Sequence, residues 1–190
     1  MMATKHYENG IIGTAEGGSA DISSDIFGTG DIFWLDSVNG NDANAGTNRN
    51  LPKATLASAL SAMAANNGDI LIIEANHTES LSSSQAISLA GIRIYGLGSG
   101  STKPAFTCTG AVDMFDITGA RVLIHNLRFP VGTTATNTAR INIGAANAGI
   151  FNCDFLCGAQ DLETITVPDA GDDAEINACT FTISADGPDA

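Results

Sequence analysis

Apolar residues recur with a fixed period in the second half of this chain. Three stretches align 26 residues apart, each with an isoleucine followed five residues later by a phenylalanine: Ile124 and Phe129, Ile150 and Phe155, Ile176 and Phe181. The stretch from Ile92 to Leu97 aligns ahead of them. Such a period indicates a solenoid, in which each repeat buries its apolar face by stacking on its neighbours. Because the repeated segments are short and strand-like, we expect an all-β parallel β-helix of about four coils.

Each coil is expected to contain three short strands with isoleucine and phenylalanine side chains pointing inward. The first strands of successive coils are predicted at Phe115/Ile117, Ile141/Ile143 and Ile165/Val167. The second strands are predicted at Val122/Ile124, Ile150 and Ile176. On the third strands, the inward columns are Leu127/Cys153/Cys179 and Phe129/Phe155/Phe181, and Arg128 is expected to lie beside Asp154 on the outside. The two stacked cysteines are interpreted as buried thiols.

A sharp bend is predicted between the second and third strands of each coil. It falls at Gly96, Asn126, Asn152 and Ala178. Glycine and asparagine tolerate the left-handed backbone conformation that a one-residue bend demands, and stacked asparagine side chains can hydrogen-bond along the axis. Because Ala178 cannot extend such a ladder, we expect the last coil to bend differently or to fray.

The chain before the coils has two predicted parts. Residues 1–30 form a glycine-punctuated arm without sustained periodicity, and residues 31–190 form the β-helix domain. Within that domain, residues 31–68 comprise an entry strand at 32–36, a turn-rich loop and a helix from Pro52 to about Ala65. The coils occupy 69–183, beginning with the strand 69–74, and a tail covers 184–190.

The arm carries apolar residues that a purely solvated tail would not favour. They are Ile11, Ile12, Ile22, Ile26 and Phe27. We interpret them as candidate partner-docking residues, with a solvated tail as the open alternative.

Composition narrows the classes of function. The net charge is −13, and from Asp154 to the end there are acids but no lysine or arginine. Such a surface repels phosphate backbones, so no nucleic-acid binding is expected. No apolar run is long enough to span a membrane and no signal pattern begins the chain, so assembly in a cytoplasm is expected.

The entry region resembles that of a known family. The motifs are Leu35–Gly46 (LDSVNGNDANAG), Pro52–Leu56 (PKATL) and Gly68–Ile73 (GDILII). They are similar to the entry module of right-handed parallel β-helix (pectate-lyase-like) proteins, many of which are phage tailspikes and other virion components. The resemblance covers roughly residues 31–183. It implies that the helix caps the N-terminal end of a right-handed solenoid, and it implies little about activity.

Enzymes of that family use a lysine or arginine base with calcium-binding acids, or carboxylates on adjacent coils. Here the outward third-strand column of Arg128, Asp154 and Thr180 supplies one carboxylate. Asp113 and Asp116 have Ala139 and Asn142 one period later. We therefore predict no catalytic residues and no enzyme activity.

No metal or cofactor site is predicted either. One cluster of acids is interpreted as part of a solvated loop, with calcium binding as the alternative: Asp161, Glu163, Asp169, Asp172 and Asp173. Turn chemistry accounts for Asp36, Asn39, Asn41, Asp42 and Asn44. His6, His77 and His125 belong to separate elements, and His125 is expected to face outward.

Three functional hypotheses follow from the resemblance and these absences. The first is a structural virion protein, a capsid decoration (cement) protein of a tailed bacteriophage. It would be a homotrimer on the capsid surface, anchored through its arm to the major capsid protein or another virion protein, and assembled in the host cytoplasm. The second is a carbohydrate-binding or carbohydrate-cleaving β-helix, for which the chain offers few aromatic stacking residues, with one tryptophan and two tyrosines. A bacterial surface module is the third.

Overall fold

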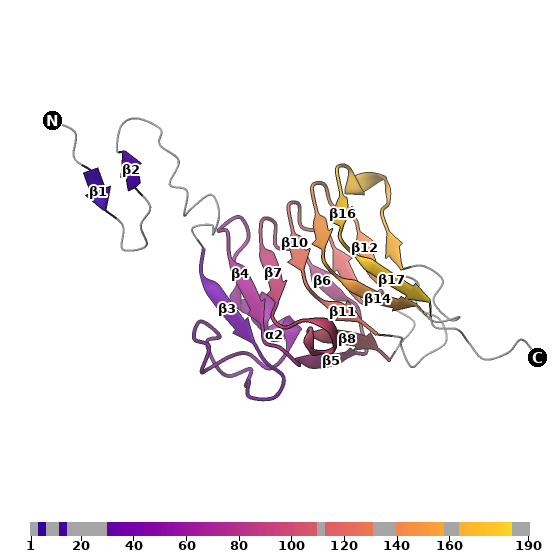
Figure 1. The fold of residues 1–190 in the computed structure, drawn as a ribbon, viewed down its shortest axis with the longest axis horizontal. Helices are drawn as coiled ribbons and strands as arrows, with labels where there is room; N and C mark the ends of the chain where they lie inside the picture. The colour runs from indigo at the N-terminus through magenta and orange to yellow at the C-terminus, as the bar shows by residue number, and fades with distance from the viewer. Residues whose placement is uncertain are drawn as a thin grey trace, which may run out of the picture.

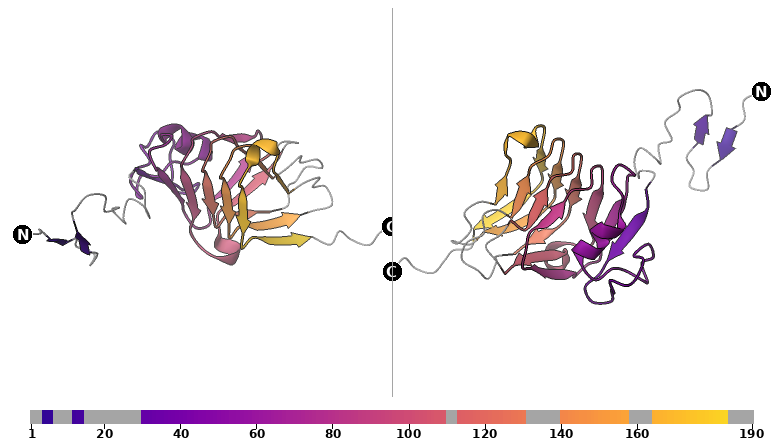
Figure 2. Two further views of the ribbon diagram at one scale, coloured as in Figure 1. Left: turned by 90° about the horizontal axis from the view of Figure 1, so that it is seen from above. Right: turned by 180° about the vertical axis from the view of Figure 1, so that it is seen from behind.

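The computed structural model describes residues 4–6, 12–14, 30–109, 113–130, 140–157 and 164–183. The chain from Gly30 onward winds into a parallel β-solenoid of about four turns, with three parallel sheets along its length (Figure 1). The entry strand lies at one end of the solenoid, and the last two strands lie at the other (Figure 2). This confirms the predicted fold class.

Consecutive coils contribute one strand each to the same three sheets. The six-stranded sheet contains β3 (Ile32–Leu35), β4 (Ile70–Ile73), β7 (Arg93–Gly96), β10 (Leu123–His125), β13 (Gly149–Phe151) and β16 (Glu175–Asn177). The five-stranded sheet contains β5 (Thr78–Leu81), β8 (Ala105–Cys108), β11 (Arg128–Phe129), β14 (Asp154–Cys157) and β17 (Thr180–Ile183). The four-stranded sheet contains β6 (Gln85–Ile87), β9 (Phe115–Ile117), β12 (Ile141–Ile143) and β15 (Ile165–Thr166).

Among the described residues, few helical segments connect these strands. The helices are α2 (Leu56–Ala62) and the short 3-10 turns η1 (Gly100–Thr102) and η2 (Asp169–Gly171). Within the arm, β1 (Thr4–His6) pairs antiparallel with β2 (Ile12–Thr14), a pairing that the sequence does not suggest. The predicted tail, 184–190, lies outside the described residues.

The repeat register is the one that the sequence predicts. Ile124 pairs with Ile94 and Ile150, and Ile150 pairs in turn with Ile176. In the phenylalanine column, the rings of Phe129 and Phe155 stack 4.9 Å apart and nearly parallel. That separation equals the spacing of neighbouring strands, so the register itself brings the rings into contact. On the four-stranded sheet the prediction reaches one residue too far, because β15 ends at Thr166 and Val167 is exposed beside Pro168.

The predicted bends are mostly confirmed. Asn126, Asn152 and Ala178 have φ of 60°, 52° and 54°, and Asn152 Nδ2 donates to Asn126 Oδ1 at 3.0 Å. The last coil therefore keeps the bend, although Ala178 ends the ladder. The bend predicted at Gly96 is wrong, because Gly96 lies in β7 and its φ is outside the left-handed region. A side chain there would meet the Asn126 carbonyl oxygen at 2.3 Å, so close approach rather than a bend requires glycine.

The capping helix is shorter than the sequence predicts. Pro52 does not begin it, because Lys53 is extended beside the entry strand and its N–H and carbonyl bond to Trp34 and Asp36. The helix begins at Leu56, with Thr55 as N-cap accepting from the N–H of Ser58. It ends at Ala62 instead of Ala65, since the N–H of Ala64 donates to the buried carboxylate of Asp69.

Three side chains tie the entry region to the first full coil. His77 is fully buried, and its Nδ1 accepts from the N–H of Ser37 at 2.9 Å. Thr78 donates its N–H to Ser37 Oγ. Glu79 points inward and accepts from the N–H of Leu56 at the start of α2. The helix is thus fixed over the open end of the solenoid, as the family resemblance implies.

Candidate functional site on the outer face of the six-stranded sheet

The six-stranded sheet carries an unusual row of side chains on its outer face. The register places one outward position of each strand in a single line, which we call the outer row: Trp34, Ile72, Tyr95, His125, Phe151 and Asn177. All but Asn177 are half-buried in the monomer. Strand alternation, which sends their neighbours into the core, makes these residues face outward.

Three rings of the outer row form a continuous stack. The Tyr95 and His125 rings lie 4.7 Å apart, and the His125 and Phe151 rings lie 4.6 Å apart, each pair close to parallel. Aromatic contacts of this kind stabilise a fold by about 0.5–1.5 kcal/mol each beyond the burial of area. Burial lowers the pKa of His125, so the imidazole in this stack is biased toward its neutral form.

A second outward row runs beside the first and is also largely apolar. It consists of Ile32, Ile70, Arg93, Leu123, Gly149 and Glu175. Ile32 is 48% exposed, and the Phe151 ring leans over Gly149. At the entry end, Arg49 covers the Trp34 ring from 5.2 Å and also pairs with Glu74. The two rows form a largely apolar sheet face that is partly exposed, with Ile70 and Gly149 buried in it, and apolar faces open to solvent commonly mark contact surfaces.

The predicted columns of the five-stranded and four-stranded sheets hold no pair of carboxylates among the described residues. Asp154 lies between Arg128 and Thr180 in the register, as predicted. The predicted pairing of Asp154 with Arg128 is wrong, because the Asp154 carboxylate forms its ion pair with Lys103 at 3.0 Å. Asp116 has Asn142 beside it, and the Asn142 amide donates to its carboxylate at 2.9 Å.

The two carboxylates of the entry loop, Asp36 and Asp42, accept structural hydrogen bonds. The carboxylate of Asp36 accepts from Val38 and Asn39, and that of Asp42 accepts from Ala54 and from both the N–H and hydroxyl of Thr55. Burial would raise the pKa values of both carboxyl groups, but these bonds lower them. Turn contacts account for Asp36 as the sequence predicts, whereas Asp42 instead links the loop to the start of the helix.

No set of three or more metal-ligating side chains occurs in the described parts of the chain. Of the predicted acidic loop, Asp161 and Glu163 lie outside those parts. His77 accepts from the backbone N–H of Ser37, His125 stacks between Tyr95 and Phe151, and His6 belongs to β1, so the three histidines lie on separate elements, as predicted. Among the candidate docking residues Ile12 lies in β2, whereas Ile11, Ile22, Ile26 and Phe27 fall outside the described residues. No helix within the described ranges is long and apolar enough to cross a membrane.

Cys153 and Cys179 occupy the same position on successive coils, as predicted, and all four cysteines are free thiols. The hydrogen bond between the two thiols, together with burial, raises the pKa of Cys153, and the same bond lowers the pKa of Cys179. Cys153 is fully buried and also contacts the N–H of Leu127. The prediction of two buried thiols therefore holds for Cys153, which lies in the core, whereas Cys179 is half-buried and packs against it.

Sequence reasoning missed the aromatic stack of the outer row. The alignment that pairs Ile94, Ile124 and Ile150 also places Tyr95, His125 and Phe151 in one line, one residue later. The signal is therefore present in the register: the sequence predicts that His125 faces outward, and the same alignment places Tyr95 and Phe151 on either side of it.

The parallel sheets and their stacked columns define the class of protein as a parallel β-solenoid. No protein-family model matches the chain, and no curated protein sequence matches it. Its fold is similar to the crystal structure of a GH136 lacto-N-biosidase from Eubacterium ramulus, a selenomethionine derivative, with a TM-score of 0.56 and 13% sequence identity. The match covers 82% of this chain and 35% of the enzyme chain, and at this identity it shows the fold alone.

Proposed function

We propose that this chain is a non-enzymatic structural module that associates through the outer face of its six-stranded sheet. The observation that carries the proposal is that face, where half-buried aromatic and aliphatic side chains line up on successive coils. Burial of such a face by a neighbouring molecule removes apolar surface from water. The described residues also lack the paired carboxylates that a family hydrolase would use.

The particular assembly that we propose is the virion of a tailed bacteriophage, with this chain as a capsid decoration protein. Support comes from the resemblance of the entry module to virion β-helix proteins, and from an arm whose apolar residues suit docking. A homotrimer fits this role, because cyclic symmetry lets each copy cover the exposed face of another and matches a threefold position on a capsid.

The first test is the native mass by light scattering of the full chain and two matched variants. We expect the wild type to give about three times 19.4 kDa. Ile32→Lys places a charge on the outer face and should shift the mass toward the monomer. Val38→Lys is the control, because Val38 is a still more exposed aliphatic residue in the entry loop. A monomeric wild type, or equal effects of the two variants, would exclude self-association through this face.

A second test addresses the arm. Removal of residues 1–29 should leave a folded solenoid, because every strand of its three parallel sheets follows Gly30. That truncated chain is expected to lose binding to capsids from which decoration proteins have been stripped. Full occupancy by the truncated chain would overturn the proposed role of the arm.

The alternative is a carbohydrate-binding or carbohydrate-cleaving β-helix. The similarity in fold to a lacto-N-biosidase favours it. Against it, Tyr95, His125 and Phe151 stack on one another and offer edges rather than faces to a sugar ring, while Arg49 covers Trp34. Binding of the purified chain to a glycan array, weakened by Trp34→Ala but not by Val38→Lys, would favour this alternative over the structural role.

A further inference from the structure

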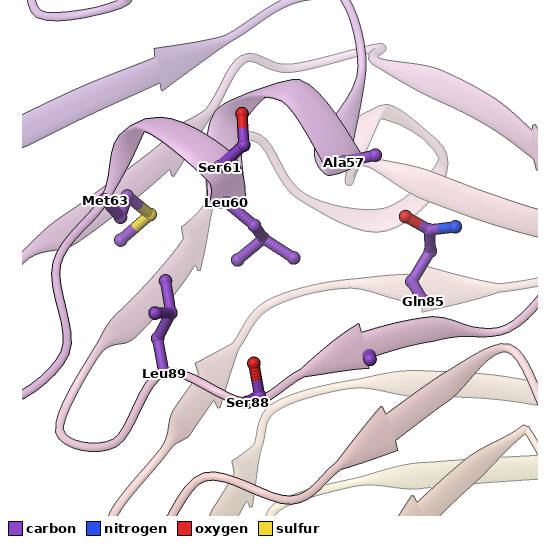
Figure 3. A pocket seen from close by; sticks show the side chains of 8 residues that line it. Ala57, Leu60, Ser61, Met63, Gln85, Ser88 and Leu89 are labelled. Carbon is purple, nitrogen blue, oxygen red and sulfur yellow. The ribbon is translucent and has the colours of Figure 1, made fainter.

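A groove of about 350 Å³ lies between α2 and strand β6 at the entry end of the solenoid (Figure 3). Leu60 and Met63 from the helix side and Leu89 from the turn after β6 supply its apolar part. Ser61, Gln85 and Ser88 form a polar rim. A groove with an apolar floor and a polar rim suits a single large apolar side chain together with its backbone.

The topology explains why the groove is there. The entry region adds β3 to the six-stranded sheet but adds no strand to the four-stranded sheet, so β6 is the last strand on that side. Helix α2 lies over this end and packs against both β3 and β6. A seven-residue helix covers the end without filling it, and the groove is the space that remains.

The arm joins the solenoid beside one end of this groove. Asp31 donates its N–H to one oxygen of the Asp69 carboxylate at 3.0 Å, and Ala64 donates to the other oxygen at 2.7 Å. Ala64 directly follows Met63, which lines the groove. Gly30 is pressed against the same turn, because a side chain at Gly30 would meet the backbone nitrogen of Asp69 at 2.4 Å. The last residue of the arm is therefore held next to the Met63 end.

The sequence places an apolar pair within reach of that point. Phe27 precedes Gly30 by three residues, a span of about 10 Å when extended. Gly28 and Thr29 lie between them, and Gly28 permits the chain to turn in either direction. Phenylalanine buries about 150–250 Å² when it is enclosed, which makes it the strongest apolar anchor in the arm.

We propose that Phe27, with Ile26 beside it, docks into the groove of its own molecule. This contact fixes the base of the arm against α2, so that the preceding residues leave the solenoid from the entry end in a defined direction. The inference goes beyond the proposed function, since it concerns a contact within one chain. It leaves Ile11, Ile12 and Ile22 as the apolar residues of the arm for a partner, whether that partner is a capsid or another surface.

The test replaces Phe27 in the full chain with the photoreactive analogue p-benzoylphenylalanine. After irradiation and peptide mapping, crosslinks are expected on Leu60, Met63 or Leu89 of the same chain. A mixture of isotopically light and heavy chains separates crosslinks within one chain from those between copies. Crosslinks between light and heavy chains, on another face, or an absence of crosslinks would overturn the proposal.

Two controls sharpen this test. The same analogue at Ala20, which lies farther along the arm, should give no groove crosslink. Ser61→Trp introduces a bulky side chain at an exposed rim position, and it should abolish the Phe27 crosslink without unfolding the solenoid. If Ser61→Trp does not fold, Phe27→Ser provides the second readout. Its loss of the aromatic ring should increase hydrogen exchange at residues 86–89, and unchanged exchange there would also overturn the proposal.

Discussion

The ammonium group of Lys103 lies 3.0 Å from Asp154 Oδ1, although the two residues are 51 positions apart. Lys103 precedes β8 and Asp154 begins β14, so the side chain crosses the intervening coil that contains β11. The same nitrogen donates to the Asn152 carbonyl at 2.8 Å. Because the Lys103 side chain is 8% exposed, this link ties together three successive coils in a partly desolvated position.

Removal of this link should destabilise the solenoid. Lys103→Met keeps the length of the side chain but leaves the Asp154 carboxylate and the Asn152 carbonyl without their shared donor. We expect the free energy of unfolding in urea to fall by about 2 kcal/mol. Arg128→Gln is the control: Arg128 neighbours Asp154 in the register, and its replacement should change stability by less than about 0.5 kcal/mol. Equal losses in the two variants would contradict the assignment of the ion pair to Lys103.

The phenylalanine column supplies a second prediction. Phe155 is fully buried between Phe129 and Phe181, with its ring 4.9 Å and 5.1 Å from theirs. Phe155→Ala should lower the free energy of unfolding by about 3–5 kcal/mol, as for other buried aromatic residues. Phe181 belongs to the same column but is 51% exposed, so Phe181→Ala should cost about 1–2 kcal/mol. A loss below about 1 kcal/mol for Phe155→Ala would place that ring outside the stacked core.

Much of this fold could be predicted from the sequence because a solenoid repeats its contacts at one spacing. The period of 26 residues fixes which residues stack, and it led directly to the Ile124–Ile150–Ile176 column. The start of α2 could not be found this way. Pro52 favours a helix start, but hydrogen bonds from Lys53 to the entry strand hold the chain extended there. Long-range backbone pairing outweighed the local preference.

The candidate site was less accessible to sequence reasoning. Outside that site, the Lys103–Asp154 pair also escapes prediction, because a long side chain reaches across one coil to a residue at a different position of the repeat. The outer row does follow the repeat, but tyrosine, histidine and phenylalanine share no obvious pattern of hydrophobicity. Their common feature is planar geometry, which becomes informative only when the register brings the rings within stacking distance.

The bend of the last coil offers a stabilising substitution. Ala178 has φ of 54°, a conformation that costs an ordinary L-residue about 1–2 kcal/mol and that asparagine tolerates better. Asparagine at this position could also donate to Asn152 Oδ1, as Asn152 donates to Asn126. We expect Ala178→Asn to raise the free energy of unfolding by about 1 kcal/mol.

The glycine variant separates the two contributions to that gain. Ala178→Gly relieves the backbone strain but adds no side-chain hydrogen bond, and glycine also loses more chain entropy on folding. Its stability should therefore fall between those of the wild type and Ala178→Asn. If asparagine is no better than glycine in urea unfolding, the ladder does not extend to the last coil.

His125 predicts a pH dependence of stability. Burial between Tyr95 and Phe151 lowers its pKa from the ordinary value of 6.5, so the unfolded chain binds a proton at this site more readily than the folded chain. The contribution of the stack is therefore complete above about pH 6.5, and it declines as the pH falls from there toward the folded-state pKa. Urea unfolding of the wild type between pH 7.5 and pH 5 should show this decline.

His125→Phe isolates the contribution of the imidazole, because it continues the row of rings with a group that does not titrate. His77 and the carboxyl groups remain in both proteins, so the difference in stability between wild type and His125→Phe removes their effects. The free energy of unfolding of His125→Phe should therefore rise relative to that of the wild type as the pH falls below about 6.5. Movement in the opposite direction would mean that cation–π attraction from Tyr95 and Phe151 stabilises the imidazolium more than burial disfavours it, and the lowered pKa would then be wrong.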